Sequence, residues 1–496
     1  QYQFMYDMGG QLFLGSTGNG YGYLAPSTTA DHAFYYNSVA TTVSGTAWGT
    51  FNPPQTRAIG FAVDCDQTTP VVEVWQCDTT DTSAGSSGWR SVYTFNLLRT
   101  DVEDGLFHCV NLQAGQVTFL EPIVPNSLAN NGYKLNRTDN LPAATIQNPS
   151  DHFDVITDAG ANILTAAQSK FSTGFWWVKD YANSNDHQFV DSLRGNNLAF
   201  TNPTVNQNQA TYVAPSGSSV AWCWKADTLD ATALAALNAS AGDQDYTAAM
   251  SNVTAGFFAG LYTTGATSNG VTKTLPHNLG KSPDWVMATQ YTGGKSGSQN
   301  YPVTYMSAFD SNSLAGAFYD NGDYNSQIWS YWSTPNVSPA TSTTMTVRSS
   351  TSSEVSNAPN RERTSGDAGD YVIYMWTSVP GYSAFGRYDP NQNADGPFIY
   401  TGFAPAFIWL KNSNNNGQDY TMYDRKRSVN NPRAEQLYIN TTGAQSNVVT
   451  LDFLSNGFKL RSSATNVNGP SAQTMVYAAF AESPFGGSNV SPATAR

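Results

Sequence analysis

The chain has 496 residues, of which only 12% are charged and 13% are aromatic, and its formal net charge is −13. With so few Lys and Arg, direct nucleic-acid binding is not expected, and no apolar run approaches the roughly 18 residues of a membrane span. The length exceeds what one hydrophobic core supports, so several domains are expected. Many aromatics among neutral hydroxyl and amide side chains are typical of extracellular β-proteins, because disordered chains lack aromatic residues.

Residues 1–145 are expected to form an N-terminal β-domain. Short alternating segments at 58–63 and 71–75 are separated by turn residues, which indicates antiparallel strands. Cys65 and Cys77 could face each other across a hairpin. Buried free thiols are the favoured interpretation for the four cysteines, because a chain of this size does not need disulfides. No CxxC pair is present, so a zinc site is not predicted.

One sequence pattern occurs three times in the rest of the chain. Residues 396–412 hold a Gly/Pro turn, a continuous apolar run and then Lys411, which opens a polar loop. Residues 173–180 repeat this pattern, and 283–290 are a looser copy. Apolar runs bounded by turn signals predict strands that are buried on both faces. Each copy is followed by an aromatic-rich strand, at 220–224, 371–376 and 476–480.

The predicted fold class is all-β, with tandem antiparallel β-sandwich-like domains. Each repeat is long enough to hold its own small core, unlike the shorter units of solenoids. Leu234 and Leu237 have rough helical spacing, so the stretch between the first two repeats is either a linker or a short helix. The expected units are a first repeat at 151–226, a linker at 227–252, a second repeat with an insertion at 253–379, a third repeat at 380–486 and a tail at 487–496.

A family resemblance rests on the repeats and covers about residues 140–486. In the first repeat it is carried by residues 151–156 (DHFDVI), 163–168 (ILTAAQ), 175–180 (FWWVKD), 190–195 (VDSLRG) and 220–224 (VAWCW). In the third it is carried by residues 379–383 (VPGYS), 395–403 (DGPFIYTGF), 453–461 (FLSNGFKLR) and 478–485 (AAFAESPF). These segments resemble repeats in tail-fibre-like structural proteins of tailed bacteriophages. The second repeat departs most from the pattern.

The resemblance implies a virion, and therefore extracellular, protein that forms a homo-oligomer, most commonly a trimer. It implies other virion tail proteins and a host surface glycan or protein as partners. It supplies no catalytic residues, and no cofactor is expected. Neither nucleic-acid binding nor membrane insertion is expected.

The polar loops after the apolar strands, at 179–186, 290–300 and 411–419, are the best candidates for binding, because loops on a rigid β-scaffold often carry recognition. Their Asn and Asp side chains suit sugar hydroxyls, although the same residues also form ordinary turns. The aromatic segment at 328–332 could stack on sugars or pack in an interface. The candidate glycan-binding residues are Tyr181, Asn183, Asn185, Trp329, Tyr331, Asn414, Asn415 and Asn416.

Charged residues supply weaker signals. Asp191 and Arg194, like Asp424 and Arg427, recur as Asp-x-x-Arg and are interpreted as structural ion pairs or turn locks. Within the densest basic cluster, residues 425–427, the charges are interpreted as surface charge near a turn. The oxygen-rich stretch 320–325 lacks the bidentate Glu of a calcium loop, so no metal site is predicted.

The sequence favours a non-enzymatic tail-fibre protein or adhesin that attaches to a host surface glycan. One alternative is a tailspike enzyme that depolymerises polysaccharide, which would need two carboxylates near a sugar bond. Another is an extracellular lectin-like or filament-forming structural protein. None of the seven Glu residues lies in a recurring aromatic context, the Asp residues are scattered at turns, and no nucleophile elbow or phosphate loop is present, so the non-enzymatic interpretation is preferred.

Overall fold

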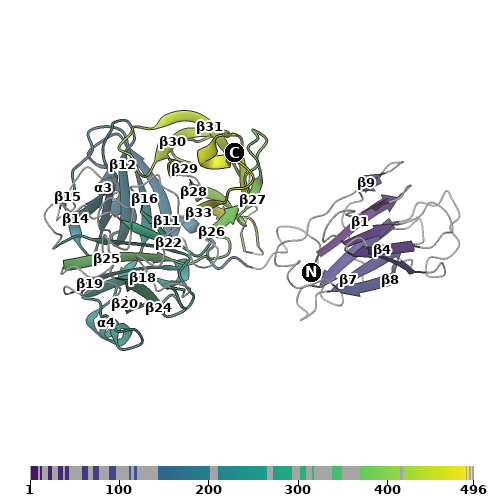
Figure 1. The fold of residues 1–496 in the computed structure, drawn as a ribbon, viewed down its shortest axis with the longest axis horizontal. Helices are drawn as coiled ribbons and strands as arrows, with labels where there is room; N and C mark the ends of the chain where they lie inside the picture. The colour runs from purple at the N-terminus through teal and green to yellow at the C-terminus, as the bar shows by residue number, and fades with distance from the viewer. Residues whose placement is uncertain are drawn as a thin grey trace. The chain divides into compact units, whose positions relative to one another are not determined.

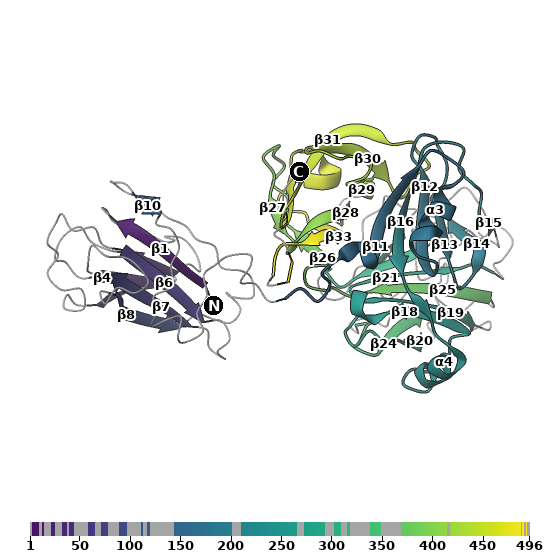
Figure 2. The same cartoon turned by 180° about the vertical axis from the view of Figure 1, so that it is seen from behind.

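The structure is a computed structural model, shown from opposite sides in Figures 1 and 2. It divides into two compact units, Gln1–Leu141 and Pro142–Arg496, each described here by itself. In the first unit the structure describes the strand backbones. In the second it describes residues 143–200, 210–264, 272–292, 302–308, 315–317, 338–348, 369–413, 417–487, 489–490 and 493.

The first unit is built from antiparallel strands, as its alternating pattern predicts. A five-stranded sheet has the order β10-β1-β6-β7-β8, β3-β4-β5 form a second sheet, and β2 pairs with β9. The β6–β7 register pairs Asp64 with Val71 and Ala58 with Cys77; Cys65 lies outside the described residues. The strands are β1 (Tyr2–Met8), β2 (Leu12–Phe13), β3 (Tyr21–Leu24), β4 (His32–Tyr36), β5 (Val39–Val43), β6 (Ala58–Asp64), β7 (Val71–Cys77), β8 (Trp89–Asn96), β9 (Asn111–Leu112) and β10 (Val117–Phe119).

Among its described residues the second unit contains three large sheets, one for each sequence repeat, besides a small two-stranded sheet. The first sheet consists of β11 (Phe153–Asp158), β12 (Gly174–Asp180), β13 (Gln188–Asp191), β14 (Gly195–Phe200), β15 (Ala210–Thr211) and β16 (Ser219–Lys225). The second consists of β17 (Asp227–Thr228), β18 (Ala248–Asn252), β19 (Phe257–Thr264), β21 (Trp285–Gln290), β22 (Val303–Met306), β23 (Ala315–Ala317) and β25 (Gly369–Trp376). The third consists of β26 (Ser383–Tyr388), β27 (Phe398–Tyr400), β28 (Phe403–Asn412), β29 (Thr421–Asp424), β30 (Arg433–Tyr438), β31 (Ser446–Leu454), β32 (Gly457–Leu460) and β33 (Met475–Pro484).

The three sheets share one topology, which places the sequence copies in equivalent positions. The five equivalent strands lie in the order β11-β16-β12-β13-β14, β19-β25-β21-β22-β23 and β26-β33-β28-β29-β30. In each sheet, the strand that comes last of the five in the chain therefore lies between the two strands that come first and second in the chain. The apolar runs form β12, β21 and β28, and the aromatic-rich segments form β16, β25 and β33 beside them. The sequence repeat is thus a repeat of sheet topology.

Each apolar run is buried on both faces, as the sequence predicts, because alternate side chains enter different cores. On one face, Phe175, Trp285 and Phe407 belong to a central cluster to which all three sheets contribute. Aromatic rings join every pair of sheets across this cluster. The centroid distances are 4.4 Å between Phe175 and Tyr374, 5.6 Å between Trp285 and Trp409, and 4.9 Å between Phe153 and Phe480.

The opposite face of each sheet has a cover of its own. Helix α3 (Ile163–Lys170) covers the first sheet and packs around Trp176. Helix α4 (Ala231–Asn238) and the two-stranded antiparallel sheet of β20 (Thr272–Pro276) and β24 (Thr344–Arg348) cover the second sheet, and both ribbon views show them together beyond β18 and β19 (Figures 1 and 2). The third sheet curls almost into a barrel, so that β31 and β32 pack with β28 around Phe458, and α6 (Thr465–Asn468) lies against β28.

Two expectations about domain organisation change. Residues 227–252, expected to be a linker or a short helix, form β17, α4 and β18, so the helical alternative holds for Ala231–Asn238 and the two strands belong to the second sheet. The reason is that Leu237 is buried in the outer cluster of that sheet, and Asp230 caps the helix by accepting a hydrogen bond from the Ala233 N–H. The repeats hold small cores of their own, as expected, but they also share the central cluster within one compact unit.

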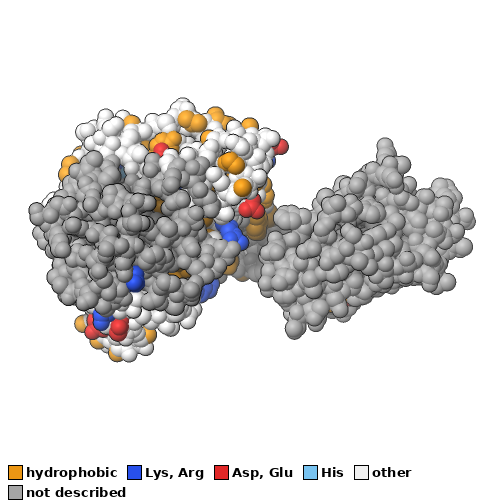
Figure 3. Space-filling view, viewed as in Figure 1, with side chains coloured by type: hydrophobic (Ala, Val, Ile, Leu, Met, Phe, Trp, Pro, Cys, Tyr) orange, Lys and Arg blue, Asp and Glu red, His pale blue; other side chains and the backbone are white. Residues whose placement is uncertain are grey.

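The described surface is poor in charge. On the face drawn in Figure 3, coloured Lys, Arg, Asp and Glu side chains are few and scattered, in keeping with the 12% of charged residues in the sequence. None of the described helices is long and apolar enough to span a membrane.

Candidate functional site

The loop after β12, a predicted binding loop, is held from inside by Lys179. Its ammonium group is buried and donates hydrogen bonds to the backbone carbonyls of Asp180 at 2.8 Å and Asn185 at 2.6 Å. A further bond, of 3.0 Å, reaches the carbonyl of Thr442 in the third repeat. Burial lowers the pKa of Lys179 to about 8, although Asp180 and Asp186 act in the opposite direction. The loop is therefore fixed to two repeats.

The predicted glycan-binding amides of this loop already have partners. The Asp180 carboxylate accepts hydrogen bonds from the side-chain amides of Asn183 at 3.0 Å and Asn185 at 2.9 Å, and from the Gly217 N–H at 3.1 Å. Burial alone would raise the pKa of Asp180, but these bonds outweigh it and the pKa is lowered. Tyr181 packs against the central cluster. The amides thus hold the loop, and sugar contact by them stays a prediction.

The other predicted binding residues cannot be placed. Trp329, Tyr331, Asn414, Asn415 and Asn416 lie outside the described residues, as does the oxygen-rich stretch 320–325. Among the residues that the structure does describe, no group of three or more His, Cys, Asp or Glu side chains could hold a metal ion.

The first Asp-x-x-Arg motif locks the first repeat to the second. Asp191 and Arg194 form a fully buried ion pair with a shortest distance of 2.6 Å, and the Arg194 N–H also donates to the Asp191 carboxylate. The Tyr374 hydroxyl, on β25, donates to the same carboxylate at 2.5 Å and accepts from Arg194 at 2.8 Å. Burial opposes the charge of Arg194, but Asp191 and Tyr374 outweigh it and raise the pKa. The predicted structural role thus extends across repeats.

The second motif locks the third repeat to the first in the same way. Asp424 pairs with Arg427 at 2.7 Å and accepts a hydrogen bond from the Trp222 indole at 3.2 Å. Trp222 occupies on β16 the place that Tyr374 occupies on β25, since each lies two residues before the aromatic that faces the start of the apolar run. In the second repeat the equivalent position, the last residue of β22, is Met306. Because Met306 is apolar and packs in the central cluster, the second repeat has no such ion pair at this position.

His187 adds another inter-repeat contact that the sequence gave no reason to single out. Its Nδ1 accepts a hydrogen bond from the Trp177 indole at 2.9 Å, and its Nε2 donates to the Tyr438 carbonyl at 3.0 Å. This arrangement requires the neutral ring. Complete burial, together with Lys179 nearby, lowers the pKa of His187 well below its ordinary value.

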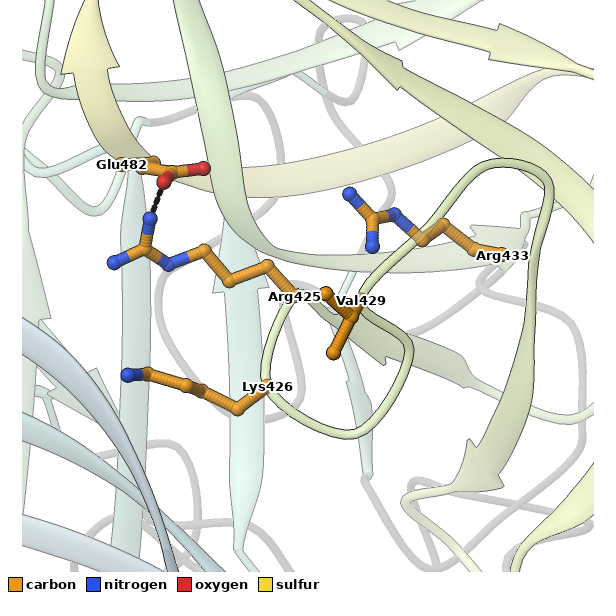
Figure 4. Close-up of a pocket in the computed structure, with 5 residues that line it drawn as sticks. All are labelled: Arg425, Lys426, Val429, Arg433 and Glu482. Atoms are coloured by element: carbon orange, nitrogen blue, oxygen red, sulfur yellow. Dashed lines mark ion pairs between the residues drawn. The ribbon is translucent and has the colours of Figure 1, made fainter. Parts of the chain in front are cut away.

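The Asp424–Arg427 turn also borders a pocket that is lined by side chains. The side chains of Asp424 and Arg427 are buried, whereas those of Arg425 and Lys426 line a cavity of about 220 Å³ (Figure 4). We call this cavity the basic pocket. Its lining residues are Arg425, Lys426, Val429, Arg433 and Glu482.

A β-bulge brings Glu482 to the pocket. Along the β28–β33 ladder, Ala404 pairs with Ser483 and Pro405 with Ala481, so Glu482 has no opposite residue. Bulges re-aim side chains in this manner. Glu482 forms an ion pair with Arg425, drawn as the dashed line in Figure 4. The only acid among the lining residues is therefore engaged by one of the three cations.

Arg433 is the most unusual member of the basic pocket. It is only 2% exposed, its guanidinium lies 4.6 Å from the Phe453 ring centre, and Nη1 donates to the Ser428 carbonyl. No described residue accepts a hydrogen bond from its Nε. None of the ion pairs between described residues includes Arg433. Burial lowers its pKa to about 10, although Asp424 and Glu435 lie near enough to oppose the shift.

The basic pocket has an excess of positive charge in a chain whose net charge is −13. The expectation of surface charge at residues 425–427 is wrong for Arg427, whose side chain is buried. Arg425 is partly exposed and paired with Glu482. The matching turn of the first repeat has Ser192 and Leu193 between its Asp and Arg. The turn is common to both repeats, but the cations belong to the third.

Comparison with protein families gives bounds that agree with the fold. Residues 148–484 match the model of a family described as a domain of unknown function, DUF7483. The chain belongs to the DUF7483 family. The DUF7483 match begins just before the first sheet and ends with the last residue of β33, so one family domain spans all three repeats. A search of curated proteins finds no match.

Proposed function

We propose that this DUF7483 protein is a non-enzymatic attachment protein of a virion tail fibre, which works outside the cell and binds a glycan on a host surface. The basic pocket is the observation that carries the proposal. It is a concave, cationic site built on a turn and strand ends of a rigid β-unit, which is where binding sites often occur. The tail-fibre context rests on the sequence resemblance of the repeats.

Binding is preferred over cleavage because of the acids at this site. Glycoside hydrolysis generally uses two carboxylates that flank the sugar bond. Of the five residues that line the basic pocket, Glu482 alone is acidic, and it is paired with Arg425. Such a site can hold a charged group, but its lining does not supply an acid and a base.

Assembly as a homo-oligomer, with a trimer favoured, belongs to the same proposal. β27 is an edge strand of the third sheet, and its Phe398 and Tyr400 are 42% and 57% exposed. Exposed apolar side chains on a strand edge suit contact with another chain. Light scattering of the purified protein checks this part, since a stable monomer at micromolar concentration would contradict it.

The attachment function is tested by incubating the labelled full chain with intact bacterial cells and with polysaccharide extracted from their surfaces. Saturable binding to both, without release of new reducing ends, is the expected result. Release of reducing ends that a change of one or two acidic residues abolishes would show a depolymerase instead. Absence of binding across a broad panel of cells would contradict the attachment function.

A further inference from the structure

We infer that the basic pocket binds the oxyanion of an acidic saccharide, either the carboxylate of a uronic acid or the phosphate of a phosphorylated sugar. This inference rests on the proposed function and specifies the ligand class of the same site. Three features carry it: a buried cation with an unused donor, two further cations at the pocket, and an apolar side chain at the same cavity.

Arg433 supplies the anchor. As a residue Arg433 is 98% buried, and a buried guanidinium is expected to have a charged or fully hydrogen-bonded partner, because desolvating a charge without one is unfavourable. The Phe453 ring and the Ser428 carbonyl contact the guanidinium but neither carries a negative charge, and Nε has no acceptor among the described residues. Figure 4 shows the guanidinium end of Arg433 directed toward the side on which Arg425 and Glu482 lie. An oxyanion there would complete its coordination and match its fork geometry.

Arg425 and Lys426 complete the charge balance. Among the five residues that line the pocket, Glu482 offsets the charge of Arg425, and Lys426 and Arg433 have no acidic partner in the lining. Lys426 is exposed, so it can follow a ligand that enters from solvent. One bound oxyanion would therefore meet an excess of positive charge without disturbing the Arg425–Glu482 pair.

Val429 indicates an organic carrier of the oxyanion and not a bare ion. It lines the same cavity and is 56% exposed, so it offers apolar surface beside the cations. The C–H face of a sugar ring can cover such a side chain while its charged substituent reaches the guanidinium. A bare inorganic anion would leave Val429 exposed to water.

The pocket is held in shape before any ligand arrives. The Asn431 side chain donates to the Phe453 carbonyl at 2.7 Å and accepts from the Phe453 N–H at 2.8 Å, which fixes the loop to β31. On the other side of Val429, the Asp424 carboxylate accepts hydrogen bonds from the N–H groups of Lys426 at 3.0 Å and Arg427 at 2.9 Å. Preorganisation of this kind reduces the entropy lost on binding.

The test measures binding of small acidic sugars to the full chain by isothermal titration calorimetry. The probes are methyl glucuronide, glucose 6-phosphate and inorganic phosphate, with methyl glucoside as the neutral control. We expect a Kd on the order of 1 mM for at least one acidic sugar. Methyl glucoside should not bind measurably, and inorganic phosphate should bind more weakly than the preferred sugar. The ratio of the Kd values for methyl glucuronide and glucose 6-phosphate shows whether the pocket prefers a carboxylate or a phosphate.

Variants assign the binding to the pocket. Lys426→Ala removes an exposed cation and should weaken binding about twofold to fivefold. Arg433→Lys keeps the charge but removes the planar guanidinium, which can donate two parallel hydrogen bonds to one oxyanion. This variant should weaken binding about tenfold or more. The matched control is Lys281→Ala, which removes an exposed cation from the second repeat and should leave binding unchanged. If Arg433→Lys does not fold, the comparison of Lys426→Ala with Lys281→Ala decides.

Two results would overturn the inference: equal binding of methyl glucoside and the acidic sugars, or equal binding by Lys426→Ala and Lys281→Ala. Its failure is distinguishable from failure of the proposed function. Cell attachment that survives in both pocket variants leaves the attachment function standing and removes the pocket from it. Binding of acidic sugars by a protein that attaches to no cell leaves the pocket standing and contradicts attachment.

Discussion

Replacing Asp191 by Asn should destabilise the second unit strongly, although the change affects only one side-chain group. Asp191 is fully buried, and its carboxylate is shared by Arg194 of its own repeat and Tyr374 of the next. In Asp191→Asn the volume is preserved, but Arg194 becomes a buried cation without a counter-charge. Breaking a buried ion pair from one side destabilises by about 3–5 kcal/mol.

The expected change in Tm follows from the number of residues that unfold together. An unfolding entropy of about 2.1 cal/mol/K per residue, over a unit of roughly 350 residues, gives about 0.7 kcal/mol/K. A loss of about 3–5 kcal/mol then lowers Tm by about 4–7 °C if the three repeats unfold together. Scanning calorimetry of the full chain measures this shift. Asp227→Asn, at an exposed position on β17, is the matched control and should change stability by less than about 0.5 kcal/mol.

A double-mutant cycle tests whether the effect crosses the repeats. Tyr374→Phe removes only the hydroxyl that donates to Asp191, and its coupling to Asp191→Asn should exceed about 0.5 kcal/mol because the two groups share one hydrogen bond. The reasoning is refuted if Asp191→Asn shifts Tm no more than the control does. It is also refuted if the variant splits the transition of this unit so that the second and third repeats melt as before.

Two further predictions concern other buried groups. His187→Gln should remove part of the acid sensitivity of the fold: the pKa of His187 is lowered, so below about pH 6.5 the unfolded chain binds a proton that the folded chain does not, and stability falls by up to about 1.4 kcal/mol per pH unit. Chemical denaturation at pH 7 and pH 5 checks this, and an unchanged pH slope in the variant would contradict it. Gly174→Ala should destabilise by about 2 kcal/mol or more, because φ is +148° and a Cβ would lie 2.1 Å from the Trp224 carbonyl oxygen. Gly195→Ala, with φ +70° and open space around the Cβ, should cost less; equal loss in the two variants would sink the steric argument.

The strands were predictable because the sequence pattern states their burial directly. Residues 175–178 and 407–410 are apolar without alternation, and both segments lie in strands that are buried on two faces. An apolar run does not indicate which hydrophobic core each of its side chains will enter. Phe175 enters the core shared by three repeats while Trp176 enters the local one, and nothing in their order distinguishes the two.

The site was less predictable, for a similar reason. Asp424 and Arg427 could be paired from their spacing, but Tyr374 and Trp222 join the motifs from other repeats. The basic pocket depends on a bulge at Glu482 that no local pattern marks. Its only sequence signal was the density of cations at 425–427. That signal could have been followed further by noting that the matching turn of the first repeat carries none.

We propose that the third repeat attaches the protein to an acidic surface glycan. A competition assay tests it most directly, by counting labelled full-length protein on bacterial cells while free sugar is added. We predict that methyl glucuronide or glucose 6-phosphate displaces the protein, that methyl glucoside does not, and that Lys426→Ala attaches more weakly than Lys281→Ala. Attachment that no acidic sugar displaces, and that both variants retain equally, would contradict this proposal.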